Sequence, residues 1–183
     1  MNIRQQLEGG NPRSLGNADV VAAHVLANQD QLEALFECVF DDDEIVRLRS
    51  GDALEKVCRQ QPDLFRPYID RLFNEVANID QASVQWHLAQ MIGELPLDQV
   101  QTHKALDILK RNLRTATDWI VLNYSLQVFA SFVQNDASLR PHFLTELKRH
   151  STASTSLLQS VPRSYCYRFN KAVFNHGLHY YQK

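Results

Sequence analysis

DDDEIVRLRSGDALEKV, residues Asp41–Val57, is the stretch that decides the fold class. Its apolar or small residues recur at i, i+4, i+7, i+8 and i+11, which is one stripe of an α-helix. The stripe consists of Val46, Ser50, Ala53, Leu54 and Val57. The acids in front of it, Asp41–Asp43 and Glu44, favour the helix dipole and can cap free backbone N–H groups. We therefore interpret this carboxylate cluster as a helix start rather than as a chemical site.

The same pattern returns along the chain. VRLRSGDALEKV (Val46–Val57), VQWHLAQMIGEL (Val84–Leu95) and VLNYSLQVFASF (Val121–Phe132) align without gaps and begin 38 and then 37 residues apart. A fourth, divergent copy, YCYRFNKAVFNH (Tyr165–His176), begins 44 residues after the third. The stripe of the second copy is Val84, Leu88, Met91, Ile92 and Leu95. Spacing of this kind is typical of stacked helix pairs.

Further helices are predicted between the copies, at Leu32–Phe40, Leu64–Val76, Ala105–Leu113 and Leu139–Leu147. Asp80 and Asp118 precede the second and third copies and are expected to cap them. Proline falls near the expected boundaries, at Pro62, Pro96, Pro141 and Pro162, where it is tolerated. Strand signals are absent from the sequence. We therefore predict an all-α chain.

The acid, Val-Arg, small residue and Ala-Leu of DDDEIVRLRSGDALEKV resemble a HEAT repeat. The segments WHLAQMIGEL and RSYCYRFNKAV also resemble small bacterial HEAT-repeat proteins, most of them uncharacterised, and the resemblance covers roughly residues 30–175. It implies an α-α superhelix, a HEAT- or ARM-like solenoid of about four helix pairs. Only Arg47 keeps the arginine of the Val-Arg pair; the matching positions hold Gln85, Leu122 and Cys166. A ladder of Asp–Arg pairs along the stack is therefore not expected.

On this basis we expect one domain over residues 1–183. The expected parts are an N-terminal tail (1–16), a capping helix (17–29), repeats at 30–61, 62–97 and 98–135, and a divergent fourth repeat with a C-terminal cap (136–183).

Composition narrows the class of protein. No run of eighteen apolar residues occurs, and the N-terminus lacks the features of a signal peptide, so we expect no membrane segment and no secretion. The three cysteines, Cys38, Cys58 and Cys166, show no CxxC spacing, which favours free, buried thiols in a reducing cytoplasm. We find no phosphate loop, GxSxG or HExxH, and His176 and His179 lack a third metal ligand in the nearby sequence. No catalytic residue, metal or cofactor is predicted.

Charge is unevenly distributed along the chain. Residues 1–146 carry 13 Lys+Arg against 21 Asp+Glu, whereas residues 147–183 carry six Lys+Arg and no acid. The basic segment either meets an acidic partner or a phosphate backbone, or neutralises acidic parts of its own fold or of another copy.

Candidate binding residues follow from the resemblance, because the second helix of each HEAT pair lines the concave side that solenoids use for partners. At about 100° per residue, Trp86 and Gln90 lie opposite the buried stripe and His87 lies on its flank. The same offsets in all four copies give the full set: Arg49, Asp52, Trp86, His87, Gln90, Asn123, Tyr124, Gln127, Tyr167, Arg168 and Lys171. Two alternatives stay open here. Trp86 either binds a partner or packs on a neighbouring helix, and His87 either binds or hydrogen-bonds a helix end.

Two functions fit this sequence. The first is a non-enzymatic module that binds a protein or peptide on the concave side, where Trp, Tyr and Arg form hot spots. The alternative is nucleic-acid binding, because some HEAT-like solenoids are DNA glycosylases. In that case Trp86 would stack on a base, Asp52 or Glu55 would supply the carboxylate, and Arg49, Arg168 and Lys171 would contact phosphates.

Overall fold

The computed structural model describes residues 1–11 and 14–157, and these residues form α-helices and short 3-10 turns with no strand among them. The all-α prediction is therefore confirmed for this part of the chain. The chain divides into two compact units, Met1–Ile108 and Leu109–Lys183. The division falls inside helix α7 (Gln99–Thr115). Cys166 and the fourth copy of the repeat, Tyr165–His176, lie outside the described residues.

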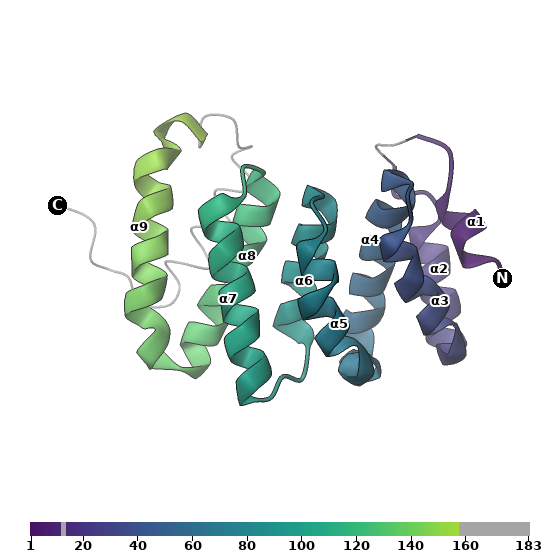
Figure 1. Ribbon diagram of the computed structural model, residues 1–183, viewed down its shortest axis with the longest axis horizontal. Coiled ribbons are helices and arrows are strands. Elements are labelled where there is room, and N and C mark those ends of the chain that lie inside the picture. Colours follow the sequence, from purple (N-terminus) through teal and green to yellow (C-terminus); the bar gives the residue numbers. More distant parts are fainter. Residues whose placement is uncertain (12–13, 158–183) are drawn as a thin grey trace. The chain divides into compact units, whose positions relative to one another are not determined.

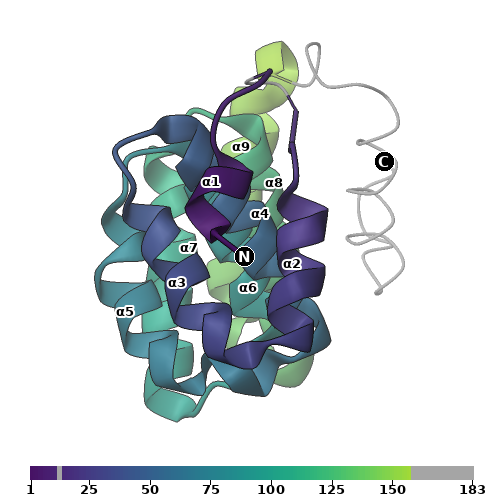
Figure 2. The ribbon, with the colours of Figure 1, turned by 90° about the vertical axis from the view of Figure 1, so that its right-hand side faces the viewer.

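The first unit arranges its helices in two layers (Figures 1 and 2). One layer holds α2 (Ala18–Ala27), α4 (Glu44–Gln60) and α6 (Ala82–Glu94), with α4 packed between the other two. The other layer holds α3 (Leu32–Glu37) and α5 (Ile69–Asn74). Short 3-10 turns join them: η1 (Gln29–Gln31), η2 (Cys38–Phe40), η3 (Pro62–Tyr68) and η4 (Val76–Asn78). The chain thus alternates between the layers.

The predicted stripes form the core of this unit. All five stripe residues of α4 are at most 1% exposed, and those of the second copy are at most 8% exposed. Asp43 caps α4, since its carboxylate accepts a hydrogen bond from the Ile45 N–H at 2.8 Å. Asp118 caps α8 in the same way, 2.7 Å from the Ile120 nitrogen. Sequence periodicity therefore identified both the buried faces and two helix starts.

Asp80 does not cap α6, so that prediction is wrong. The N-cap position is Gln81, and its side chain makes no capping bond. Instead the Gln81 amide donates to the Glu44 carbonyl at 2.9 Å and accepts from Arg47 at 2.6 Å. This contact ties the start of α6 to the first turn of α4.

The helices of the layer that holds α3 and α5 are shorter than the sequence predicted. The expected helix Leu32–Phe40 is split into α3 and η2, and Leu64–Val76 is split among η3, α5 and η4. Pro67 lies inside η3 and has no N–H to donate, so a regular helix cannot form through it.

Residues 1–16, expected to be a tail, contain a packed helix. Helix α1 (Ile3–Leu7) buries Ile3 and Leu7 at 4% and 0% exposure. Its Arg4 pairs with Asp41 at 2.7 Å. The following helix α2 matches the predicted capping helix and packs along α4. Ile3 and Leu7 therefore join the first unit's core, while the described residues that follow α1 are exposed.

The second unit contains the end of α7, then α8 (Trp119–Asn135), η5 (Ala137–Leu139) and α9 (Arg140–Leu157). Phe129 of α8 meets Phe143 of α9 edge to face, with ring centroids 5.5 Å apart. Glu146, only 3% exposed, pairs with Arg114 at 3.0 Å. The helices expected at Ala105–Leu113 and Leu139–Leu147 are both present. No helix in the described part of the chain is long and apolar enough to cross a membrane.

Candidate functional site

The candidate site is the outward side of the α2–α4–α6 layer in the first unit, turned away from α3 and α5 (Figure 2). We call it the second-helix face. Its side chains are Asp19 of α2, Asp52, Glu55, Lys56 and Arg59 of α4, and Trp86, His87, Gln90 and Glu94 of α6. Trp86 and Gln90 are half-buried.

His87 is the most unusual group on this face. It is 6% exposed, and neither ring nitrogen has a hydrogen-bond partner among the described residues. The ring lies against Gly51 of α4, where an added Cβ would be 3.3 Å from His87 Cδ2. Burial, and then the nearby Lys56 charge, lowers the pKa of His87 to about 3, so the imidazole is neutral. The alternative in which His87 hydrogen-bonds a helix end is therefore wrong, and its role in binding stays a prediction.

Trp86 lies beside this imidazole, with ring centroids 5.5 Å apart and planes tilted by 56°. Trp86 is half-buried, so both alternatives for it stay predictions.

Arg49 does not belong to an open surface, which corrects the sequence expectation. It is 2% exposed, and its guanidinium donates to the carbonyls of the segment that follows α1. The Nη1 distances are 2.7 Å to Leu7 and 2.7 Å to Gly9, and Nε reaches Ser14 at 3.1 Å. Helical geometry alone predicted an open side of the helix at Arg49, and a segment about forty residues earlier in sequence covers that side.

Asp52 is also buried, at 6% exposure, whereas the sequence placed it on the open binding surface. Lys56 one turn later donates to it at 2.6 Å and also to the exposed Asp19 of α2. Neither Lys56 nor Asp19 was among the predicted site residues. The i, i+4 spacing of Asp52 and Lys56 was the signal that could have identified the first of them.

Glu55 is the second buried carboxylate, at 6% exposure, and its nearest cation is the exposed Arg59 at 3.4 Å. Burial raises the pKa of Glu55, and repulsion from Asp52 and Glu94 adds to this although Arg59 opposes it. Glu94 is exposed. These carboxylates therefore act on one another through space along the face.

The remaining predicted residues fall elsewhere. Asn123, Tyr124 and Gln127 lie on α8 in the second unit, and all three are half-buried. Tyr167, Arg168 and Lys171 lie outside the described residues. The structure therefore brings together Asp52, Trp86, His87 and Gln90, and places Arg49 on the side of α4 that carries the N-terminal segment.

Comparison with known proteins adds no relative to this description: no protein-family model, no curated protein and no solved structure matches the chain.

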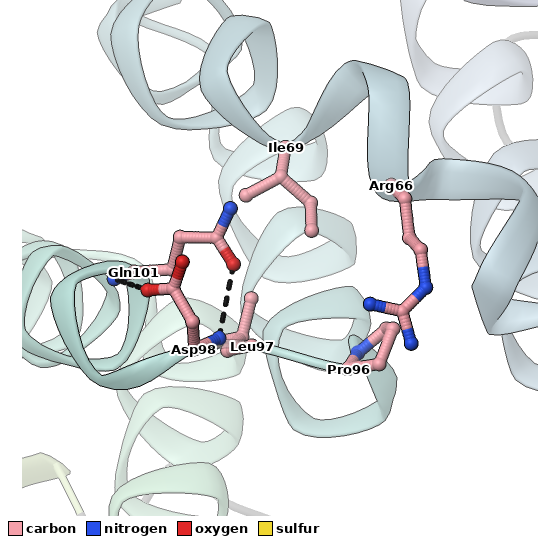
Figure 3. Close-up of a pocket in the computed structure, with 6 residues that line it drawn as sticks. All are labelled: Arg66, Ile69, Pro96, Leu97, Asp98 and Gln101. Carbon is pink, nitrogen blue, oxygen red and sulfur yellow. Dashed lines mark hydrogen bonds between the residues drawn. The ribbon is translucent and has the colours of Figure 1, made fainter.

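A pocket of about 440 Å³ lies elsewhere in the first unit, between η3, α5 and the start of α7 (Figure 3). Arg66 and Pro96 line one side, Asp98 and Gln101 the other, and Ile69 and Leu97 complete it. Asp98 and Gln101 hydrogen-bond each other's backbone N–H at 2.8 and 3.0 Å, which caps α7. Arg66 pairs with Asp63 at 2.9 Å. These polar groups serve the fold, so the pocket is a weaker candidate.

The two thiols in the described part of the chain lie in surroundings that disfavour the reactive thiolate. Cys38 and Cys58 are free and buried, and burial raises their pKa values to about 11 and about 12. Within the described residues, no group of three or more His, Cys, Asp or Glu could hold a metal ion.

Proposed function

We propose that this chain is a non-enzymatic, cytoplasmic interaction module, a HEAT- or ARM-like α-α superhelix that binds a protein or peptide on the second helices of its pairs. One observation carries the proposal. Trp86 is a large aromatic side chain, half-open on the second-helix face and braced by the buried His87. Tryptophan is enriched among binding hot spots, and a ring that is already held loses little freedom when a partner covers it.

Gln90 supports this proposal. It lies one turn after Trp86 and is likewise half-buried, so a carboxamide stands beside the aromatic ring. A carboxamide both donates and accepts hydrogen bonds, and it can therefore orient a peptide backbone placed over Trp86.

The test is a pull-down with the tagged full chain from the soluble lysate of its source organism, with and without nuclease. Trp86→Ala and Gln90→Arg should both lose a nuclease-resistant protein partner. Tyr68→Ala is the matched control, because Tyr68 is a half-buried aromatic residue of the other layer. Circular dichroism establishes that the variants are folded. A partner retained equally by both face variants would show that the face is not the binding site.

Nucleic-acid binding is the second candidate, and charge favours it. Residues 109–183 carry ten Lys+Arg and three Asp+Glu, a net +7, whereas residues 1–108 carry nine and eighteen, a net −9. The base-excision version has lost support, because Arg49 is engaged by carbonyls and Asp52 by Lys56. Binding of a labelled DNA duplex that weakens steeply with salt would favour this candidate. Retention of the protein partner after nuclease treatment would disfavour it.

A further inference from the structure

We propose that the second-helix face binds an arginine- or lysine-rich amphipathic segment of another protein, with an apolar side chain on Trp86 and a cation at Glu94. This inference rests on the proposed function and specifies the chemistry of the partner.

The charge on the face is the first reason. Four carboxylates, Asp19, Asp52, Glu55 and Glu94, share two cations, Lys56 and Arg59. Lys56 bridges Asp19 and Asp52, and Arg59 pairs with Glu55. Glu94 therefore stands exposed on a face with a surplus of two negative charges, inside a unit of net charge −9. Such a surface steers basic partners toward it and repels acidic ones.

The buried imidazole is the second, independent reason. His87 is 94% buried, and both of its nitrogens lack a hydrogen-bond partner among the described residues. Buried polar groups are otherwise nearly always paired in folded proteins, and the exceptions gather where a fold serves binding rather than its own stability. The ring lies over Gly51, one turn of α4 before Glu55, and the charge of Lys56 on the same face acts on it.

The helix geometry sets the spacing that the partner must have. Trp86 and Glu94 are eight residues apart on α6, which places their Cα atoms about 12 Å apart along the axis. A partner helix presents an apolar residue and a cation at that separation on one face when they are seven or eight positions apart. The charge of Glu94 already acts on Glu55 through space. A guanidinium or ammonium group bound at Glu94 would therefore also be attracted by Glu55.

The experiment uses three fluorescein-labelled peptides of about five helical turns. They share one Ala/Leu pattern and carry Arg, Gln or Glu at every polar position. Fluorescence anisotropy with the full chain measures affinity at low and at physiological ionic strength, and ¹⁵N NMR follows the His87 imidazole. We expect the Arg peptide to bind, to lose affinity with salt and to shift the His87 resonances.

Glu94→Lys should weaken the Arg peptide by about tenfold, because it replaces an attraction with a repulsion of the same size. Glu33→Lys is the matched control, since Glu33 lies on α3 in the other layer and shares Arg71 with Glu37. It makes the same change in net charge and should leave affinity within about twofold, since screening limits surface charges to short range.

Three outcomes would overturn the inference: no binding of the Arg peptide, equal binding of the Gln peptide, or equal loss in the two lysine variants. The third would mean that general acidity, and not this face, attracts the peptide. A native partner captured by the wild type and lost with Trp86→Ala would still uphold the proposed function in each case. Failure of the two ideas is therefore distinguishable.

Discussion

Replacing Arg49 by alanine tests how the N-terminal segment is held. Its guanidinium is buried beneath the chain that follows α1 and donates to five carbonyls, those of Leu7, Glu8, Gly9, Asn11 and Ser14. The distances run from 2.7 to 3.3 Å. Among the described residues no carboxylate pairs with this cation, so the carbonyl dipoles alone balance its charge.

The loss in the free energy of unfolding depends on whether water can reach the five carbonyls after the substitution. A hydrogen bond to a charged group contributes about 1.5–3 kcal/mol, so five of them set a high nominal sum. The segment can detach and rehydrate, however, and the loss then cannot exceed the free energy that docks it. That free energy comes mainly from the guanidinium and from the burial of Ile3 and Leu7. We therefore expect Arg49→Ala to lower the free energy of unfolding by about 3 kcal/mol.

The assay should report on the first unit alone. The chain has two tryptophans, Trp86 in the first unit and Trp119 in the second. In a Trp119→Phe background, urea unfolding followed by fluorescence therefore reports the environment of Trp86. Hydrogen exchange of the Ile3–Leu7 amides measures release of the segment directly, since opening without global unfolding raises exchange there first.

Two further variants decide the interpretation. Arg49→Lys keeps the charge but lacks the planar fork of donors, so it should recover less than half of the loss. Arg66→Ala removes a cation that is 61% exposed and should cost less than about 1 kcal/mol. The reasoning is refuted if Arg49→Lys matches the wild type, or if Arg49→Ala leaves both the urea midpoint and the exchange of α1 unchanged.

Three other substitutions have definite expected results. Gly16→Ala should destabilise the first unit by about 1–2 kcal/mol in urea unfolding, because Gly16 has φ +52° and a Cβ there would lie 2.8 Å from Arg49 Cζ; the effect should shrink in the Arg49→Ala background. His87→Leu should flatten the pH dependence of stability: the folded pKa of about 3 lies below the unfolded value of about 6.5, so wild-type stability falls as pH drops through that window, by up to about 1.4 kcal/mol per pH unit. Glu55→Gln should stabilise the protein near neutral pH and not in acid. The pKa of Glu55 is raised in the folded chain, so the stability that its protonated carboxyl contributes in acid is lost as pH rises through the folded pKa. The prediction fails if the variant and the wild type have the same urea midpoint near neutral pH as well as in acid.

The buried stripes could be predicted from sequence because they depend only on the geometry of a single helix. Val46, Ala53, Leu88 and Ile92 repeat with the helical period, and whichever layer covers them must bury that face. The cap at Asp43 followed from local chemistry for the same reason. The breaks in the helices around α3 and α5 were harder to predict. Pro67 interrupts one of them because it has no backbone N–H to donate within the helix.

The candidate site was harder to predict because its flanks are formed by neighbours. Helical angles place Arg49 and His87 beside the stripe, and an isolated helix would leave both half-open. In the first unit α4 lies between α2 and α6, so its flanks become interfaces. Gly51 admits the ring of His87 on one flank, and the segment after α1 covers Arg49 on the other. Neither contact has a local signal in the sequence.

Positions opposite the stripe stay partly exposed, because the other layer covers the stripe side of each helix. Trp86 and Gln90 are such positions, and both are half-buried on the second-helix face. The carboxylates of α4 show the limit of this rule, since Asp52 and Glu55 are buried although they lie toward the same side. Burial raises the pKa of Glu55, and the His87 imidazole of the same face has no hydrogen-bond partner among the described residues. Under the inference proposed above, a cationic partner would offset part of the electrostatic cost of these carboxylates, so the proposal rests on the partner's charge rather than on its shape.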